Sequence, residues 1–201
     1  MRTIGRRISI IACTTALASL AALPALAAAP PVPAIPALGA VATLKLTAPG
    51  VEIRIGAKTE KVDLSGDIVV RVVAGETDPL KAVRLRVLDL NLAGKLPKGD
   101  VSIRPDTYDA AAAGELRLNT AVPPTLTHTL SLSLRVTVNQ PDVSPEPLVL
   151  STKDAAKLVG TLKKFPPTGE THQLQNPVDL VNTAKPNATA AVIAKFALMV
   201  G

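Results

Sequence analysis

The chain has 201 residues, with 22 Lys and Arg against 16 Asp and Glu, and it contains one Tyr, two Phe and no Trp. Without the three arginines of its first seven residues, the net charge falls from +6 to +3. A mild charge and almost no aromatic rings to stack on bases or sugars argue against a nucleic-acid or carbohydrate partner.

The first 27 residues have the pattern of a secretory signal peptide. Arg2, Arg6 and Arg7 precede an apolar run over Ile8–Leu23, and small residues occupy the −3 and −1 positions of a cleavage site after Ala27. The run is shorter than the roughly 20 residues of a membrane-spanning helix. We therefore expect cleavage after Ala27 and a secreted or periplasmic product with no transmembrane segment.

Two other interpretations of the leader are less favoured. Cys13 follows a lipobox-like Ile-Ile-Ala, but too little apolar sequence precedes it for a lipid anchor. Arg6-Arg7 resembles a twin-arginine signal, although the residues after it match that pattern loosely. Cys13 is the only cysteine in the chain. The processed chain therefore has neither a disulfide nor a thiol nucleophile.

Residues 28–40 are rich in Pro and Ala, a composition typical of an extended linker. From residue 41 to 201 we expect a single domain dominated by β-strands. The expected strands cover residues 41–47, 51–55, 62–64, 68–74, 82–92, 101–103, 115–119, 125–139, 178–181 and 190–200. Turns are expected at 48–50 and 65–67.

The segment Ala82–Leu92 changes its alternation halfway. Val83, Leu85 and Val87 share one parity, and Leu88 begins the opposite one. Because side chains alternate with a period of two along a strand, this change predicts a β-bulge or bend at Val87-Leu88.

The segment Thr125–Asn139 has the clearest alternation in the chain and predicts one long amphipathic strand. Its apolar parity carries Leu126, His128, Leu130, Leu132, Leu134, Val136 and Val138. Its other parity is a row of Thr and Ser, which fits a solvated face, a water-ordering face or a face paired with another copy.

A single helix is expected over residues 151–165. Ser151 can cap it, Asp154 follows three residues later, an apolar stripe continues to Leu162, and Pro166-Pro167 ends it. Together these elements predict an all-β antiparallel β-sandwich of immunoglobulin-like type with one short helix.

No group of residues forms a recognisable catalytic, cofactor or metal motif. His128 lies on the apolar parity of its strand and His172 in a polar segment expected to be a surface loop; neither has ligand-like neighbours. The acidic segments 65–67 and 106–109 fit turns better than calcium loops. A Gly-x-Ser-x-Gly elbow is absent from the sequence. We therefore assign no catalytic, cofactor-binding or metal residue.

Two further surface features remain open. Asn187-Ala188-Thr189 matches the N-glycosylation pattern, which matters only in a host that glycosylates. Lys153, Lys157, Lys163 and Lys164 make the expected helix basic, which its C-terminal dipole favours.

These features together predict an exported, non-enzymatic β-sandwich protein. It would act as a binding or structural module at the cell surface or in the extracellular or periplasmic space, with an unknown protein or cell-envelope component as partner. A secreted hydrolase or lyase with an unrecognised site is the alternative. Self-association through a sheet edge is a third interpretation.

Overall fold

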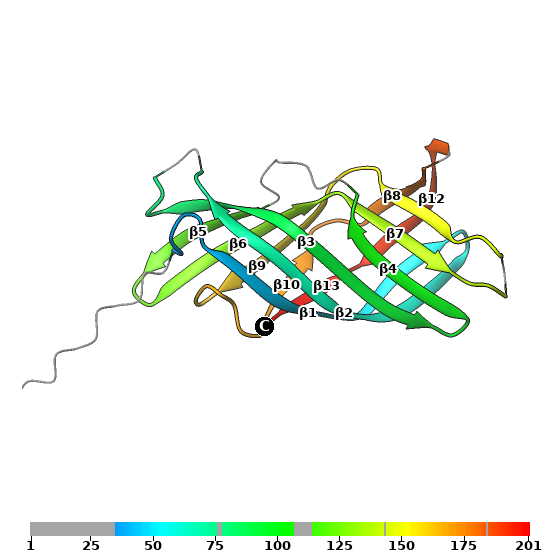
Figure 1. Ribbon diagram of the computed structural model, residues 1–201, viewed down its shortest axis with the longest axis horizontal. Helices are drawn as coiled ribbons and strands as arrows, with labels where there is room; N and C mark the ends of the chain where they lie inside the picture. Colours follow the sequence, from blue (N-terminus) through cyan, green and yellow to red (C-terminus); the bar gives the residue numbers. More distant parts are fainter. Residues whose placement is uncertain (1–34, 76–77, 107–113, 143, 184) are drawn as a thin grey trace, which may run out of the picture. The chain divides into compact units, whose positions relative to one another are not determined.

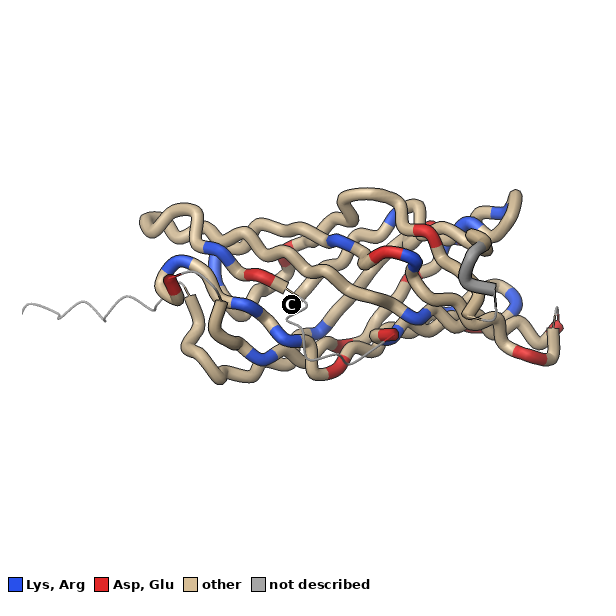
Figure 2. Tube along the Cα trace, turned by 90° about the horizontal axis from the view of Figure 1, so that it is seen from above, with Lys and Arg blue, Asp and Glu red and all other residues tan. Residues whose placement is uncertain are grey.

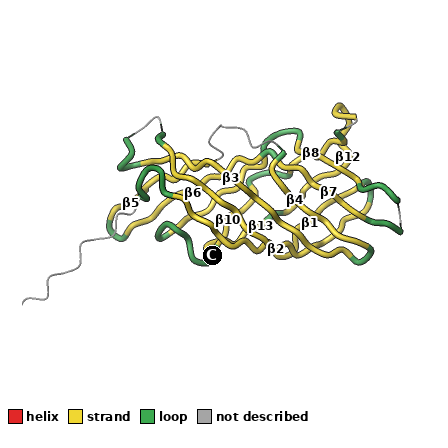
Figure 3. The backbone as a smooth tube through the Cα atoms, viewed as in Figure 1, coloured by secondary structure: helices red, strands yellow, loops and turns green. Residues whose placement is uncertain are grey.

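The computed structural model describes residues 35–75, 78–106, 114–142, 144–183 and 185–201, and these form thirteen β-strands (Figures 1 and 3). The strands are β1 Val41–Ile55, β2 Lys58–Val73, β3 Ala82–Leu96, β4 Gly99–Pro105, β5 Gly114–Ala121, β6 Pro124–Leu132, β7 Leu134–Asn139, β8 Leu148–Thr152, β9 Ala156–Leu162, β10 Glu170–Leu174, β11 Val178–Asn182, β12 Lys185–Lys195 and β13 Ala197–Val200. Every pairing is antiparallel. The described part contains no helix, and therefore none long and apolar enough to cross a membrane. The expected leader, 1–27, and linker residues 28–34 lie outside the described residues.

All thirteen strands belong to one sheet, in the order β12-β11-β8-β7-β4-β3-β2-β1-β13-β10-β9-β6-β5. Two additional pairings, β12 with β1 and β3 with β5, join the two ends of this order to its middle. The first circuit of paired strands therefore runs β1-β2-β3-β4-β7-β8-β11-β12, and the second runs β1-β2-β3-β5-β6-β9-β10-β13. The two circuits share β1, β2 and β3.

The three shared strands bend or bulge where they pass between the circuits. The β1–β2 register shifts between Ala48 and Val51. The β2–β3 register shifts so that Val69 faces Asp89 while Val70 faces Val87, which leaves Leu88 as the extra residue. The predicted bulge at Val87-Leu88 is thus confirmed.

A glycine permits β2 and β3 to approach each other closely near these register shifts. Gly66 of β2 faces Leu92 of β3, and a Cβ built on Gly66 would overlap the carbonyl oxygen of Asn91. Any side chain at this position would force the strands apart. The segment 65–67, expected to be a turn, therefore lies inside strand β2, and Gly66 serves backbone packing there.

Apolar side chains fill the inside of both circuits, because alternate residues of each strand point inward. A large cluster spans the two circuits and includes Leu46, Ile53, Val136 and Phe196. A smaller one lies in the second circuit and consists of Val72, Val83, Leu85, Leu116, Leu126 and Leu162. Among the described residues, every fully buried apolar side chain lies between Leu44 and Val200. The compact unit 33–201 therefore has a core of its own and is expected to fold without the preceding residues.

The outward side chains are mostly polar. Figure 2 shows basic and acidic positions interspersed along the strands. The outward Thr and Ser positions of β6 and β7 are half-buried or exposed, as the alternation predicts.

The prediction of a helix over 151–165 is wrong. Ala156, Leu158, Gly160 and Leu162 are buried while the residues between them point outward, so the segment is strand β9, paired with β6 and β10. The apolar residues of this segment fit both the 3.6-residue period of a helix and the two-residue period of a strand. Pairing with β6 on one edge and β10 on the other favours the strand. The all-β antiparallel class is confirmed. The immunoglobulin-like sandwich is not confirmed, since the strands form one continuous sheet.

The long strand expected over 125–139 divides at Ser133. Its inward residues are all buried, as predicted. However, β6 pairs with β5 and β9, whereas β7 pairs with β4 and β8. The segment thus leaves the second circuit and enters the first, and its neighbours change at the break. The turn expected at 48–50 similarly lies within strand β1.

Candidate functional site

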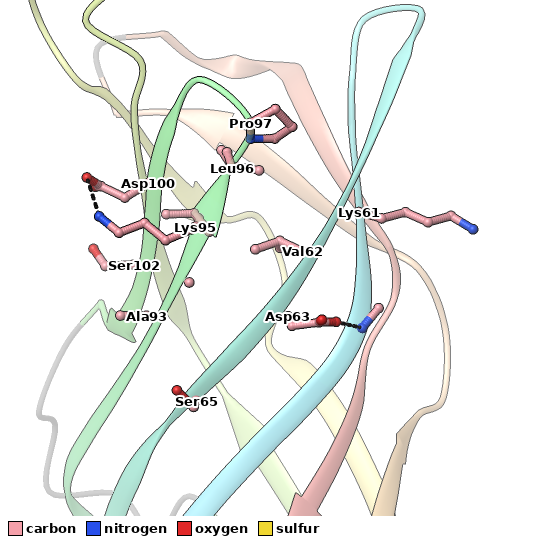
Figure 4. A pocket seen from close by; sticks show the side chains of 13 residues that line it. Lys61, Val62, Asp63, Ser65, Ala93, Lys95, Leu96, Pro97, Asp100 and Ser102 are labelled. Atoms are coloured by element: carbon pink, nitrogen blue, oxygen red, sulfur yellow. Dashed lines mark hydrogen bonds and ion pairs between the residues drawn. The ribbon is translucent and has the colours of Figure 1, made fainter.

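The first candidate is a concave notch where β2 and β3 separate. These strands pair from Ser65–Ala93 to Val73–Arg84. Before Ser65, the residues Lys58–Leu64 of β2 still pair with β1 but have no strand partner on their other edge among the described residues. Figure 4 shows the β1–β2 hairpin and the β3–β4 hairpin diverging on either side of the opening.

The notch has a volume of about 1100 Å³ and combines a polar rim with an apolar floor. Inward side chains of three strands, Val62, Leu96 and Val101, form the floor and are at most 8% exposed. The rim residues are Lys61, Asp63, Ser65, Ala93, Lys95, Pro97, Asp100 and Ser102. The notch therefore extends from the outer surface to the edge of the core.

Local interactions hold the rim charges in place. Asp63 Oδ1 accepts a hydrogen bond from the Gly50 amide at 2.7 Å. Lys95 Nζ lies 3.9 Å from Asp100 Oδ2 (Figure 4). With Lys61, the rim carries two cations and two carboxylates. It therefore has no net charge that would select an ionic ligand.

Gly94 of β3 marks the closed end of the notch. A Cβ built there would overlap the carbonyl oxygen of Asp63 and would lie under 3 Å from side-chain atoms of Val62 and Leu64. The absence of a side chain lets β3 contact β2 at this point. Beyond Gly94 the strands diverge, so this glycine sets how far the notch reaches.

The second candidate is a histidine pair inside the second circuit. His128 of β6 and His172 of β10 are 1% and 0% exposed. His172 Nε2 lies 2.8 Å from His128 Nδ1, so one ring donates a hydrogen bond to the other. The rings meet edge to face, with centroids 4.8 Å apart and planes at 88°.

Gly160 of β9 brings the two rings together. It faces His128 on one side and His172 on the other. A Cβ at this position would lie 2.7 Å from His172 Cδ2. The His172 ring therefore occupies the space that any other residue at 160 would fill.

Burial keeps both rings neutral at ordinary pH. Burial, together with a smaller effect of the neighbouring His172, lowers the pKa of His128 to about 3. Burial also lowers the pKa of His172, although the Leu198 backbone and the Glu170 carboxylate act in the opposite direction. The outer nitrogens, His128 Nε2 and His172 Nδ1, have no hydrogen-bond partner among the described residues.

The pair has no access to solvent, so no substrate can reach either ring in this structure. Within the described ranges, no three His, Cys, Asp or Glu side chains gather as a metal site would require.

The prediction of a surface loop at His172 is wrong, because this residue lies in strand β10. Glu170, Thr171 and Gln173 are polar, and only one side chain of β10 points fully inward, so the segment has no apolar alternation to reveal a strand.

Of the other segments singled out in the sequence, 65–67 reaches the notch through Ser65 on its rim. Asp106 binds Arg135 with an oxygen–nitrogen distance of 2.7 Å, and residues 107–109 lie outside the described residues. The side chain of Asn187 is also outside them. The sequence analysis missed the notch, because alternation shows which face of a strand is buried but not where two strands part. Gly66 and Gly94, which allow close approach, were the available signal.

Comparison with known proteins shows a shared fold. No protein-family model and no curated protein sequence matches the chain. The solved structure of DynF, from the dynemicin biosynthesis pathway of Micromonospora chersina, superposes with a TM-score of 0.67. The match covers 86% of this chain and 85% of that one, at 15% sequence identity. At that identity the similarity concerns the fold alone.

Proposed function

We propose that this chain is an exported, non-enzymatic binding protein that holds an extended polypeptide segment in the notch between β2 and β3. The proposal rests on one observation: β2 pairs with β1 along Lys58–Leu64, apart from the register shift at Asp63, while its other edge has no strand partner among the described residues. An open strand edge offers regularly spaced N–H and C=O groups. An added strand satisfies them, as in β-augmentation.

The surroundings of this edge suit a peptide. Main-chain hydrogen bonds to β2 would supply affinity for any extended chain. Every second side chain of such a segment would face the apolar floor of Val62, Leu96 and Val101, and the others would face the rim. The balanced rim charges favour a ligand with small apolar residues in alternation over a strongly charged one.

Selection from a library of linear heptapeptides displayed on phage, with immobilised residues 33–201 as bait, tests the proposal. A synthetic copy of an enriched peptide is then titrated by fluorescence anisotropy. We expect Ala93→Trp, which places a bulky ring on the rim, to weaken binding at least tenfold. Ala74→Trp, at another exposed alanine, serves as the matched control.

Hydrogen exchange of the bound complex locates the peptide. We expect protection of backbone amides between Lys58 and Leu64. Absence of any enriched peptide would refute the proposal. So would equal binding by the Ala93→Trp variant, or protection confined to another strand.

Export is supported by the sequence of the leader. Expression of the full chain in a secreting bacterial host, followed by mass spectrometry, should give a product beginning at Ala28. A product that retains Arg2 or Cys13 would contradict this part of the proposal.

The alternative function, a secreted hydrolase or lyase, gains no support from the histidine pair, because both rings are closed off from solvent. Its test is a panel of hydrolase substrates with His128→Ala and His172→Ala. Activity lost in a variant that still folds would favour the enzyme over the binding protein.

A further inference from the structure

The second circuit closes through the shortest pairing in the sheet. Strand β13 meets β1 at the cross-strand neighbours Leu46–Val200 and Thr47–Met199. No other two neighbouring strands pair over so short a stretch. This junction is here called the seam. Because few backbone hydrogen bonds hold it, the second circuit opens at lower cost here than along its longer pairings.

The histidine pair lies one strand away from the seam. The backbone bond from the Gly201 amide to the Lys45 carbonyl, at 3.0 Å, extends the seam by one residue. On its other edge β13 pairs with β10, where His172 faces Leu198, a residue that is 1% exposed. Separation of β13 from β1 would therefore give solvent a path to the inside of the circuit beside His172.

The surroundings of the two rings suit neutral groups only. His128 lies between Leu126, in the smaller apolar cluster, and Leu130, in the larger one. On β9, Leu162 and Leu158 belong to the same two clusters. The pair is thus enclosed between two apolar layers. Among the described residues, no Asp, Glu, Lys or Arg side chain is buried.

Glu170 of β10 is the charged side chain that acts on the pair. It is half-buried, and its carboxylate accepts a hydrogen bond from the Thr168 amide at 2.5 Å. Together with the Leu198 backbone it raises the pKa of His172, but burial lowers that pKa by more. The buried positions of β1, β2, β3, β5, β9 and β13 carry no titratable side chain among the described residues.

A proton added to the pair finds no partner. Because one ring donates to the other, the free acceptor is the outer nitrogen of the donor ring, either His172 Nδ1 or His128 Nε2. Neither atom has a hydrogen-bond partner among the described residues. A first proton would create a cation in apolar surroundings, and a second would place two cations in adjoining rings. Water solvates both charges, so acid favours any state that exposes the rings.

We infer that the seam is an acid-sensitive closure: protonation of the histidine pair separates β13 from β1 and opens the second circuit, while the first circuit stays closed. Strand β12 holds the first circuit through its own pairing with Glu52–Ile55 of β1. The chain has two histidines, and both lie on strands outside the first circuit. Phe196 joins β12 to β13 and is the point at which the chain bends.

Hydrogen exchange of residues 33–201 at pH 7.5 and pH 5, corrected for the intrinsic rate at each pH, tests the inference. We expect the protection of β10 and β13 to fall at least about thirtyfold, the effect of one ring that binds a proton only when exposed. At pH 5 these amides should be at least about tenfold less protected than those of β7 and β8, because they exchange through the open seam. The variant His128→Leu/His172→Leu should lose most of this pH dependence.

A disulfide across the seam tests where the domain opens. Thr47→Cys/Met199→Cys places two thiols on exposed cross-strand neighbours, and the natural Cys13 lies outside residues 33–201. When oxidised, this variant should protect β10 and β13 as well as β7 and β8 at pH 5, and after reduction it should respond like the parent. Thr127→Cys/Thr161→Cys joins β6 to β9 away from the seam and should leave the acid response unchanged.

Equal protection of the two sets of strands at pH 5 would overturn the inference, because the pair would then destabilise only the domain as a whole. An unchanged pH dependence in His128→Leu/His172→Leu would do the same. So would an oxidised seam variant that still loses protection, or a β6–β9 disulfide that abolishes the response. Failure of the seam disulfide to form, measured by thiol titration, would contradict the β1–β13 register on which the inference rests.

Discussion

At the scale of single residues, the histidine pair inside the second circuit depends on the small size of Gly160 and on one hydrogen bond between the two rings. His128 and His172 are neutral, buried and bonded to each other. In either tautomer, one outer nitrogen is left as a donor and the other as an acceptor, both without a partner among the described residues. A buried polar pair whose hydrogen-bonding groups are satisfied on one side only makes the folded state less stable than a fully satisfied pair would.

Folding stability should decrease as the solution becomes acidic. The pKa of His128 is about 3 in the folded state against an ordinary value of 6.5 for the unfolded chain, so the unfolded chain binds more protons between these values. The stabilisation is complete above pH 6.5 and is lost as the pH falls toward 3. Between pH 7.5 and pH 5 the loss should be roughly 2 kcal/mol from His128, measured by urea unfolding at each pH.

The variant His128→Leu/His172→Leu is the control for this titration. It replaces a polar pair by apolar side chains, a change that is often neutral or stabilising. Its free energy of unfolding should vary much less over the same pH range. An equal pH dependence in the variant would assign the effect to other groups.

Gly160→Ala should separate the two rings. The new Cβ would lie 2.7 Å from His172 Cδ2, closer than real contacts allow, so the ring must move. We expect a loss of roughly 1–3 kcal/mol in thermal or urea unfolding. Gly75→Ala is the matched control, since its Cβ would meet nothing nearer than 3.6 Å. Equal stability of the two variants would show that the ring has room to turn.

At the scale of elements, alternation predicted the buried faces well. The bulge in β3 and the inward parity of β6 and β7 follow from the period of two alone. The segment 156–162 was misread because its apolar residues fit a helical stripe as well as a strand. Only the pairing with β6 and β10, which is not local in sequence, decides between them.

Deletion of Leu88 tests the meaning of the bulge. Without the extra residue, Val83 and Leu85 would share one parity with Leu90 and Leu92, so the same side chains could stay buried and β3 would pair regularly with β2. What the deletion removes is the bend at the point where β3 passes between the circuits. We expect the deletion variant to fold with a lower free energy of unfolding than Leu88→Ala, which keeps the bulge, as measured by urea unfolding. Equal stability of the two variants would show that the bend is not needed.

At the scale of the whole molecule, the strand order could not be predicted. Alternation says which face is buried but carries no information on which strand is the neighbour. The notch and the histidine pair both depend on that order: β2 must part from β3, and β6 and β10 must flank β9. Chemistry that arises from residues 44 positions apart leaves no local motif.

Hydrogen exchange of the unbound chain should reveal the unequal pairing of β2. Amides that point into the notch between Lys58 and Leu64 should exchange faster than those between Gly66 and Arg71, which have partners on both edges. Peptide-resolved mass spectrometry measures both sets in one experiment. Uniform protection along β2 would indicate that the notch is closed in solution.

The closure of both circuits on β1 has a consequence for the order of events during synthesis. Among the described strands, β1 is synthesised before all others, yet it pairs with β12 and β13, which are synthesised after all others. Most contacts are thus between distant parts of the chain, which slows folding. A nascent chain of this design cannot close either circuit before β12 and β13 have been synthesised, so the described domain stays incompletely folded until both strands are available.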